Sequence, residues 1–423
     1  MRSKYKQTWL TISLINLSLV ALLGFLLRSK ILFSIPFVNF KYTLHAHSHF
    51  AFGGWISLAL ITLMISEILT KADAGRKIYQ WLLSAFFLSA AGMLVTFLIQ
   101  GYGPFSIFFS TLFIFVSYAF AGVFTKHTAR SSASTPVKIL SIGAVIYLSI
   151  SSIGPFTLAY LLASRSDNVV LYKDSIYTYL HLQYNGFFTL AVFALLINRI
   201  ENLLPNKTFK TLLNFSRMLT LSVIPSLFLC YLWHYPNAFF MAIAYTGSIT
   251  MLLSLAYFLV IARESTPALQ HTNAIVKYIG GLSLAAFCLK MFLQSLTVFR
   301  PVGDLVFNNR PVIIGFLHLV LLGFVTLYIL SHLIHSGILK YNQYTTFAVI
   351  TFSGGIILNE ATLMLQGVGM MIMKSSAAFP WLLWIAAIEL LTGSILIVAA
   401  RLISIKVKRP KQMDPATELY HYL

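Results

Sequence analysis

The chain has 423 residues, of which 58% are hydrophobic and 10% are charged, and its mean hydropathy is +0.82. This composition excludes a water-soluble globular domain, because a soluble fold carries far more charged surface. The net charge of +19 would point to nucleic acid in a soluble protein. In so apolar a chain, basic loops on the cytoplasmic side of a membrane explain it, so we expect a lipid bilayer and no nucleic acid as the partner.

Apolar segments long enough to cross a bilayer recur along the whole chain. Each span needs about 20 apolar residues, and the breaks between segments carry polar, Gly and Pro clusters that are typical of turns. The expected spans are 8–28, 44–69, 78–100, 102–125, 138–163, 177–198, 209–232, 237–262, 275–299, 311–333, 345–371 and 380–404. The sequence therefore predicts an all-α polytopic membrane bundle of about twelve transmembrane helices, with one domain over 1–404 and a basic cytoplasmic tail over 405–423.

Lys and Arg are distributed unevenly over the alternate loops. Placing the N-terminus inside assigns most of them to the cytoplasm, and positive loops resist translocation. We therefore expect both termini to be cytoplasmic. The first apolar run lacks a small-residue cleavage site and is interpreted as a signal anchor. Cys230 and Cys288 lie inside apolar runs, so we interpret them as small core residues.

Six of the eleven histidines carry the functional hypothesis. The other five fall in or beside loops, near the inner end of a span, or in the tail: His127, His271, His332, His335 and His421. The six open or close four of the expected spans: His45, His47, His49, His181, His234 and His318. In the predicted topology they share one depth near the outer face. Neutral imidazoles without neighbouring carboxylates suit haem iron or copper better than hydrolytic zinc. The alternative for each histidine alone is an interfacial residue at a helix end that is hydrogen-bonded to a carbonyl.

Four short motifs surround these histidines. They are Leu-His-Ala-His-Ser-His-Phe-Ala-Phe-Gly-Gly at 44–54, His-Leu-Gln-Tyr-Asn-Gly-Phe at 181–187, Trp-His-Tyr at 233–235 and Phe-Leu-His-Leu-Val-Leu-Leu-Gly at 316–323. The pattern resembles the catalytic subunit (subunit I) of the haem-copper oxidase superfamily, which includes the nitric oxide reductases. That family has twelve helices, with metal ligands in helices 2, 6, 7 and 10 toward the outer face. The resemblance implies a b-type haem between helices 2 and 10.

The resemblance assigns the axial ligands of this haem. In helix 2, His45 is the best match to the family's histidine. The motif is one residue shorter than in the family, so His47 and His49 remain alternatives, because residues two apart do not share a helical face. In helix 10, His318 matches the second histidine of the family's His-x-His segment, and the first position is Phe316, which cannot ligate iron. The expected axial pair is His45 and His318.

The resemblance also implies a copper site and contacts to the haem propionates. His181 in helix 6 and His234 in helix 7 would keep two of the family's three copper-binding imidazoles, and Asn185 stands where nitric oxide reductases place a carboxylate. Lys41 and Arg310 are expected to pair with propionates, or alternatively with lipid phosphates.

Three functions remain open from the sequence. The first is an oxidoreductase or electron-transfer protein that acts on oxygen or nitric oxide, with electrons from a quinol or cytochrome donor. The second is a non-catalytic haem or metal sensor that responds to nitric oxide, and the third is a transporter. The resemblance implies a bacterial inner membrane. Within the apolar spans, Lys290, Glu360 and Glu389 are candidates for a proton route, or Glu360 or Glu389 forms an ion pair with Lys290. We favour the ion pair.

Overall fold

The computed structural model describes residues 3–234, 237–267, 270, 272–371, 374 and 376–406. The regular elements of this part are all helical, and twelve helices are long and apolar enough to cross a membrane. The prediction of an all-α bundle with twelve spans is confirmed, and each expected apolar run coincides with one of these helices. The predicted tail lies outside the described residues beyond position 406.

Several spans are built from more than one helical segment. In chain order, the spans are α1 (Ser3–Leu32); α2 (Phe40–Phe50) with η1 (Ala51–Ser57) and α3 (Leu58–Glu67); α5 (Lys77–Gln100); α6 (Pro104–Arg130); α7 (Thr135–Ile150) with α8 (Ile153–Ala163); α9 (Val169–His181) with η2 (Leu182–Phe188) and α10 (Thr189–Ile200); α11 (Phe209–Leu227) with η5 (Phe228–His234); α12 (Ala238–Ser265); α13 (Ala274–Leu296); α15 (Arg310–His318) with η7 (Leu319–Thr326) and α16 (Leu327–His335); α17 (Gln343–Met371); and α18 (Ala378–Lys406). The connections contain α4 (Lys71–Ala74), η3 (Glu201–Leu203), η4 (Asn206–Thr208) and α14 (Arg300–Asn308).

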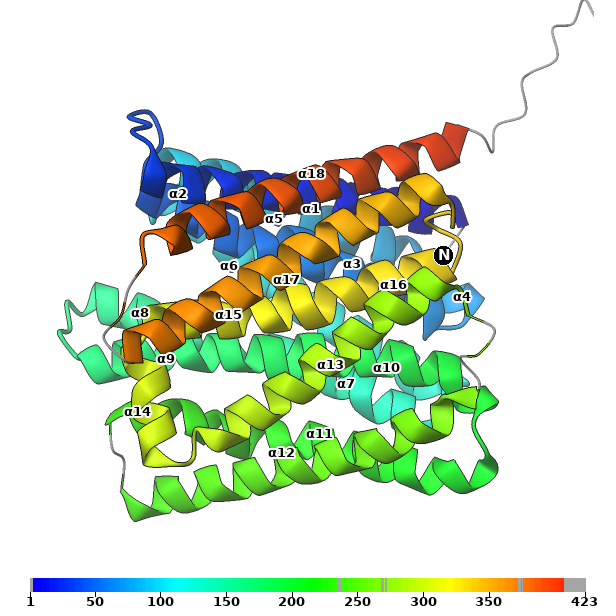
Figure 1. The fold of residues 1–423 in the computed structure, drawn as a ribbon. Helices are drawn as coiled ribbons and strands as arrows, with labels where there is room; N and C mark the ends of the chain where they lie inside the picture. Colours follow the sequence, from blue (N-terminus) through cyan, green and yellow to red (C-terminus); the bar gives the residue numbers. More distant parts are fainter. Residues whose placement is uncertain are drawn as a thin grey trace, which may run out of the picture.

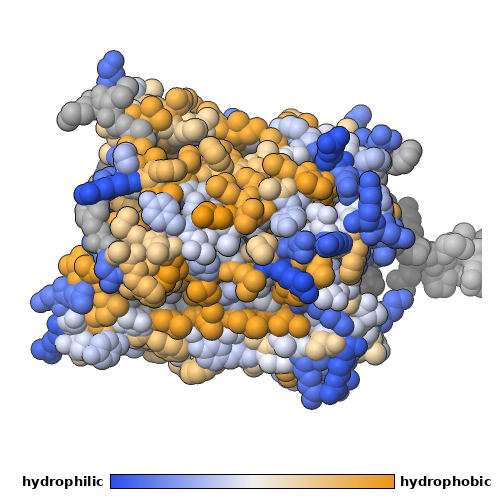
Figure 2. All heavy atoms as spheres, turned by 90° about the horizontal axis from the view of Figure 1, so that it is seen from below, coloured by the Kyte–Doolittle hydropathy of each residue, from blue (hydrophilic) through white to orange (hydrophobic). Residues whose placement is uncertain are grey.

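The helices lie side by side, and their ends form two opposite sides of the bundle (Figure 1). The start of α1 and the end of α18 lie on the same side, which we call the N-terminal side, and the opposite one is the far side. Hydrophobic surface covers the middle of the face drawn in Figure 2, and hydrophilic residues gather toward both ends. This distribution is that of an integral membrane protein. That the N-terminal side is cytoplasmic stays a prediction from the loop charges.

The twelve spans form three consecutive groups of four, over residues 3–130, 135–265 and 274–406. In each group, the second span packs against the first and third, and the third packs against the fourth. The fourth span then contacts the first span of the next group: α6 meets α7, α12 meets α13, and α18 returns to α1. The second spans also contact one another, through α3 with α10, η1 with η7, and η2 with η7. The chain thus closes into a ring around three central spans.

Each central span contains a π-helical segment, and η1, η2 and η7 are the π-helices found in the described part of the chain. Each segment begins directly after, or two residues after, a histidine. A histidine, four residues, a glycine and an aromatic residue recur in all three: His49, Gly54 and Trp55; His181, Gly186 and Phe187; His318, Gly323 and Phe324. Because π-helical segments are rare and frequently mark functional sites, this recurrence points to the histidine ends of the central spans.

Close packing of α11 against α12 depends on Gly247. A Cβ at this position would lie 2.5 Å from the backbone carbonyl group of Pro225 in α11. We expect Gly247→Ala to lower the free energy of unfolding in detergent by about 1–3 kcal/mol, because backbone atoms must move to accommodate the methyl group. Gly281→Ala in α13 is the matched control, since its Cβ would meet nothing within 4 Å. Alanine favours helix, so the control should unfold at the same or a slightly higher temperature; equal losses in both variants would contradict this packing.

Candidate functional site

The three histidines of α2 point in two directions. His49 Nε2 contacts the Tyr102 hydroxyl at 2.9 Å, and the His49 ring stacks on Phe97 with centroids 4.4 Å apart. The His45 ring lies on the same side, 4.6 Å from the Tyr102 ring, and its buried Nε2 has no hydrogen-bond partner. The Tyr102 hydroxyl can donate a hydrogen bond to His49 Nε2. His45 and His49 therefore face α5 and the turn that follows it.

His47 points the other way, toward α1, and shares its surroundings with His318. His47 Nδ1 lies 3.0 Å from the Val20 carbonyl oxygen, and His318 Nδ1 lies 2.9 Å from that of Ile314. A carbonyl only accepts hydrogen bonds, so each Nδ1 carries the proton and each Nε2 keeps its lone pair. The two rings lie within electrostatic range of each other and of Arg28. Metal-binding histidines are oriented in the same way, through a carbonyl on the second ring nitrogen.

The histidine end of span 10 is loosely packed. None of the nine residues of α15 is buried, although the equivalent helices α2 and α9 each contribute buried residues. Further along, η1 and η7 do touch, and Trp55 Nε1 donates to Thr326 Oγ1 at 2.9 Å. On α1, a Cβ at Gly24 would lie 3.2 Å from His47 Cε1. Spans 2 and 10 therefore contact each other at their π-helical segments, whereas the residues of α15 around His318 are only partly covered.

The cation nearest this histidine pair is Arg28, near the end of α1. It is half-buried and acts electrostatically on both His47 and His318. Lys41 and Arg310, the expected propionate contacts, are both exposed, and Lys41 acts on His45 instead. Arg28 is not among the propionate contacts expected from the sequence. Arg28 stands one turn after Gly24, at the end of an apolar span. This position is the sequence signal that would have identified it as a cation close to the histidines.

His181 belongs to a different environment, which we call the buried polar cluster: His181, Asn185, Cys230, Lys290 and Gln294. His181 Nε2 donates to the Val223 carbonyl oxygen at 2.9 Å, so its Nδ1 is the acceptor. Three donors converge on this one lone pair: Asn185 Nδ2 at 3.1 Å, Gln294 Nε2 at 3.4 Å and Cys230 Sγ at 3.5 Å. Cys230, interpreted from the sequence as a core residue, thus contacts a histidine.

Lys290 is completely buried within the same cluster. Its ammonium group donates to Asn185 Oδ1 and lies 3.6 Å from Met291 Sδ. The expected ion pair with Glu360 or Glu389 is wrong, because neither carboxylate is a partner of Lys290 in the described residues, and Glu360 accepts from Asn359 instead. Lys290 therefore places its side-chain nitrogen next to Asn185, and no carboxylate among the described residues pairs with it.

His234 does not join His181. It lies at the end of η5, where its Nε2 contacts Asp174 Oδ2 at 3.0 Å, and Trp233 Nε1 donates to the other oxygen of Asp174 at 2.8 Å. Asp174 precedes His181 by seven residues in α9, which is about 10 Å along a helix. Tyr235 of the same motif lies outside the described residues.

The residues present therefore do not fit the expected copper site of His181 and His234. Within the part of the chain that the structure describes, no group of three or more His, Cys, Asp or Glu residues could hold a metal ion.

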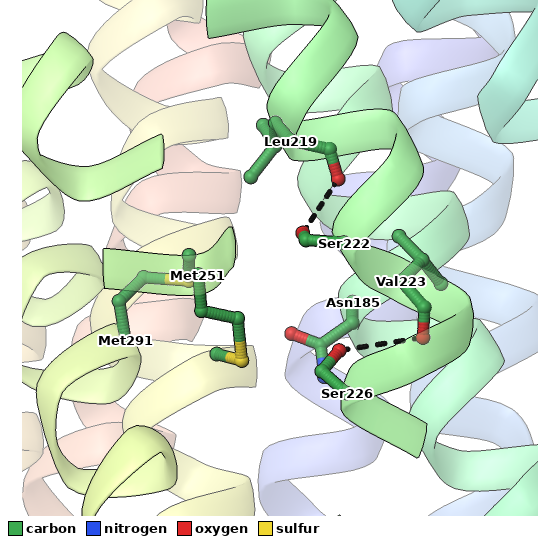
Figure 3. Close-up of a pocket in the computed structure, with 7 residues that line it drawn as sticks. All are labelled: Asn185, Leu219, Ser222, Val223, Ser226, Met251 and Met291. Atoms are coloured by element: carbon green, nitrogen blue, oxygen red, sulfur yellow. Dashed lines mark hydrogen bonds between the residues drawn. The ribbon is translucent and has the colours of Figure 1, made fainter. Parts of the chain in front are cut away.

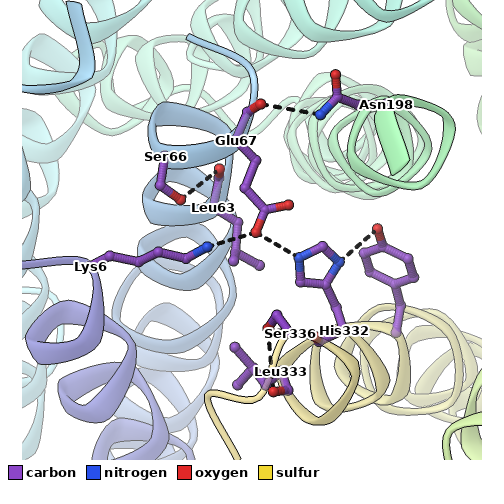
Figure 4. A network of polar contacts seen from close by, with 9 residues as sticks. Lys6, Leu63, Ser66, Glu67, Asn198, His332, Leu333 and Ser336 are labelled. Atoms are coloured by element: carbon purple, nitrogen blue, oxygen red, sulfur yellow. Dashed lines mark hydrogen bonds and ion pairs between the residues drawn. The ribbon is translucent and has the colours of Figure 1, made fainter. Parts of the chain in front are cut away.

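A second polar network joins the central spans on the N-terminal side (Figure 4). Glu67, at the end of α3, accepts from Lys6 Nζ at 2.7 Å and contacts His332 Nε2 at 2.9 Å. Its backbone carbonyl accepts from Asn198 of α10 at 3.1 Å. His332 is buried, with Nδ1 3.4 Å from the Tyr328 hydroxyl. His332 is not among the six histidines of the functional hypothesis, although a carboxylate at the end of an apolar span, such as Glu67, requires a partner of this kind.

Comparison with known proteins adds no relative. No family model matches the chain, and no curated protein matches it at a significant level. The functional proposal therefore depends on the site geometry and on the resemblance of the motifs.

Proposed function

We propose that this protein is a membrane haem protein that holds a b-type haem between spans 2 and 10, with His47 and His318 as its axial ligands. One observation carries the proposal. Both imidazoles have Nδ1 fixed by a backbone carbonyl and a free Nε2 lone pair, and they lie within electrostatic range of each other. His47 replaces His45 in the expected pair, because His45 faces Tyr102.

The neighbouring residues also suit a haem. Arg28 supplies a positive charge beside both imidazoles, which would pair with a propionate. Gly24 lets the His47 ring lie close to α1. The unburied residues of α15 supply apolar surface that a flat macrocycle would cover. When bound between two imidazoles, the haem would transfer electrons rather than bind a gas.

Following the resemblance, we place this haem in electron transfer linked to oxygen or nitric oxide, with a quinol or cytochrome as the donor and a bacterial inner membrane as the location. A non-catalytic haem sensor is the second candidate. The separation of His181 from His234 favours it, because a reductase of this type needs a second metal beside the haem. We therefore extend the proposal to haem binding and electron transfer, and not to turnover at copper.

The optical spectrum of the purified full chain tests this proposal. We expect a sharp b-type band in the reduced-minus-oxidised spectrum that carbon monoxide leaves unchanged, because both axial positions are filled. Pyridine haemochrome analysis should give about one haem per chain, and metal analysis should give far less than one copper. Protein that is purified from haem-replete cells and carries no haem would refute the proposal. A band that shifts with carbon monoxide would refute the bis-imidazole assignment.

A further inference from the structure

The interior around His181 is closed to further ligands. Figure 3 shows the pocket between Asn185 and Ser226 on one side and Met251 and Met291 on the other. This pocket leaves no space for a water molecule, and three donors already share the lone pair of His181 Nδ1. A histidine that binds a ligand besides the proposed haem must therefore lie closer to the surface.

His45 and His49 form a pair at the far-side end of span 2. They are four residues apart in α2, so their side chains share one face of the helix. Both rings pack on the same two aromatic rings. The Tyr102 centroid lies 4.6 Å from that of His45 and 5.9 Å from that of His49, and the Phe97 centroid lies 6.0 Å and 4.4 Å away. The two imidazoles are also within electrostatic range of each other. They are therefore neighbours.

The Nε2 atoms of this pair are available to a ligand. His45 Nε2 is buried and has no hydrogen-bond partner, although nearly all buried polar atoms have one. His49 Nε2 contacts the Tyr102 hydroxyl at 2.9 Å, and Tyr102 is 55% exposed. Because Tyr102 lies at the surface, its side chain can move aside without opening a void in the core. A ligand that accepts electron pairs would give both nitrogens a partner.

The spacing and the donor atoms favour zinc as this ligand. Two histidines four residues apart on one helix face are the zinc-binding pair of His-Glu-x-x-His helices. Zinc(II) binds neutral imidazole and has no geometric preference of its own. Within the described residues, no group of three His, Cys, Asp or Glu could hold a metal, so water would complete the coordination. Lys41, which acts on His45, is exposed, so water and salt screen its charge.

We propose that His45 and His49 bind one zinc(II) ion through their Nε2 atoms, at the far-side end of span 2. The ion takes the place of the Tyr102 hydroxyl at His49 Nε2 and supplies the partner that His45 Nε2 lacks. The site lies on the other face of α2 from His47, so it is separate from the proposed haem and does not depend on it. It binds zinc without a carboxylate that could act as a hydrolytic base.

Equilibrium dialysis with zinc-65 tests the site on the purified full chain, without an affinity tag and after treatment with a chelator. In the wild type, we expect saturation at about one tightly bound ion per chain. Excess magnesium should not displace it, because Mg²⁺ prefers oxygen ligands. His45→Ala should weaken zinc binding at least tenfold, which corresponds to about 1.4 kcal/mol. His335→Ala is the matched control, because His335 is exposed at the opposite end of the bundle, and it should bind zinc as the wild type does.

Two further variants make the result decisive. His49→Gln keeps a side chain that can hydrogen-bond the Tyr102 hydroxyl but supplies no imidazole, so it should weaken zinc binding as His45→Ala does while the packing is kept. His47→Ala removes a histidine from the other face of the same helix and should bind zinc unchanged. Wild-type affinity in either His45→Ala or His49→Gln would overturn the proposal, as would an equal loss in His335→Ala or His47→Ala, or a wild type that binds no zinc.

Discussion

Replacing His318 with alanine is expected to abolish the low-spin b-type haem spectrum. His318 Nε2 carries the free lone pair, because its Nδ1 is held by the Ile314 carbonyl, and alanine leaves one side of the proposed haem without a ligand. His47→Ala should have the same effect from the opposite side. We expect haem retained per chain to fall to about a tenth or less, since each iron–imidazole bond and its orienting contact are lost together. The measurement is the reduced spectrum together with the pyridine haemochrome.

The His45→Ala variant tests whether His47 or His45 is the axial ligand that α2 supplies. The His45 ring packs on Tyr102, away from His318, so its removal should leave the haem band at full intensity. A spectrum lost in His45→Ala and kept in His47→Ala would restore the pair expected from the sequence. Adding free imidazole to His47→Gly supplies a second readout, because recovery of the low-spin band requires a vacant ligand position and not merely a misfolded chain.

Glu67→Ala is expected to lower the free energy of unfolding in detergent by about 2–4 kcal/mol. The substitution leaves Lys6 and the buried His332 without their common partner, and breaking an ion pair of this burial is strongly destabilising. Glu67 also holds three spans together, since Lys6 comes from α1 and His332 from α16. Unfolding in mixed micelles of mild detergent and dodecyl sulfate, followed by intrinsic fluorescence, measures the loss.

The exposed pair between Arg76 and Asp73 provides the control. Its atoms lie 2.9 Å apart, much like those of Lys6 and Glu67, but the Arg76 side chain is 59% exposed. Arg76→Met should therefore change stability by less than about 1 kcal/mol. A double-mutant cycle of Glu67→Ala with Lys6→Met should show a coupling energy. Equal effects of Glu67→Ala and Arg76→Met would mean that the network contributes no more than a surface pair.

The fold could be predicted from the sequence because the bilayer imposes one simple rule on it. Runs of about 20 apolar residues must be helices, and the twelve runs found in the sequence are the twelve long helices of the structure. The ring of three groups was not predicted. In each central span, a histidine is followed five residues later by a glycine and then by an aromatic residue. Comparing the three spans with one another would have revealed this repeat, and with it the three groups.

For the proposed haem site, the sequence predicts which helices supply the ligands but does not decide which histidine of α2 is the ligand. Spacing alone places His45 and His47 on different faces of α2 but does not decide which face meets span 10. The contacts show the neighbour of each histidine: Val20 and Gly24 of α1 lie beside His47, and Tyr102 lies beside His45. On these neighbours we base the proposal that His47 is the ligand. The partners of Glu67 and Lys290 were missed for a similar reason. His332, the partner of Glu67, is 265 positions away from it in the sequence, and Asn185, the partner of Lys290, is 105 positions away. No local sequence pattern encodes such distant contacts.

The return of α18 to α1 constrains how this protein is made. Arg401 Nε donates to Thr11 Oγ1 at 3.0 Å, and its Nη1 donates to the Ile338 carbonyl at 2.6 Å. Because α18 follows all the other described spans in the chain, the flank of α1 that packs on α18 has no such neighbour until α18 has been made. A chain that ends before residue 378 would lack α18 and would leave the faces of α1 and α17 that α18 covers without their protein partner, and such uncovered surfaces favour misassembly.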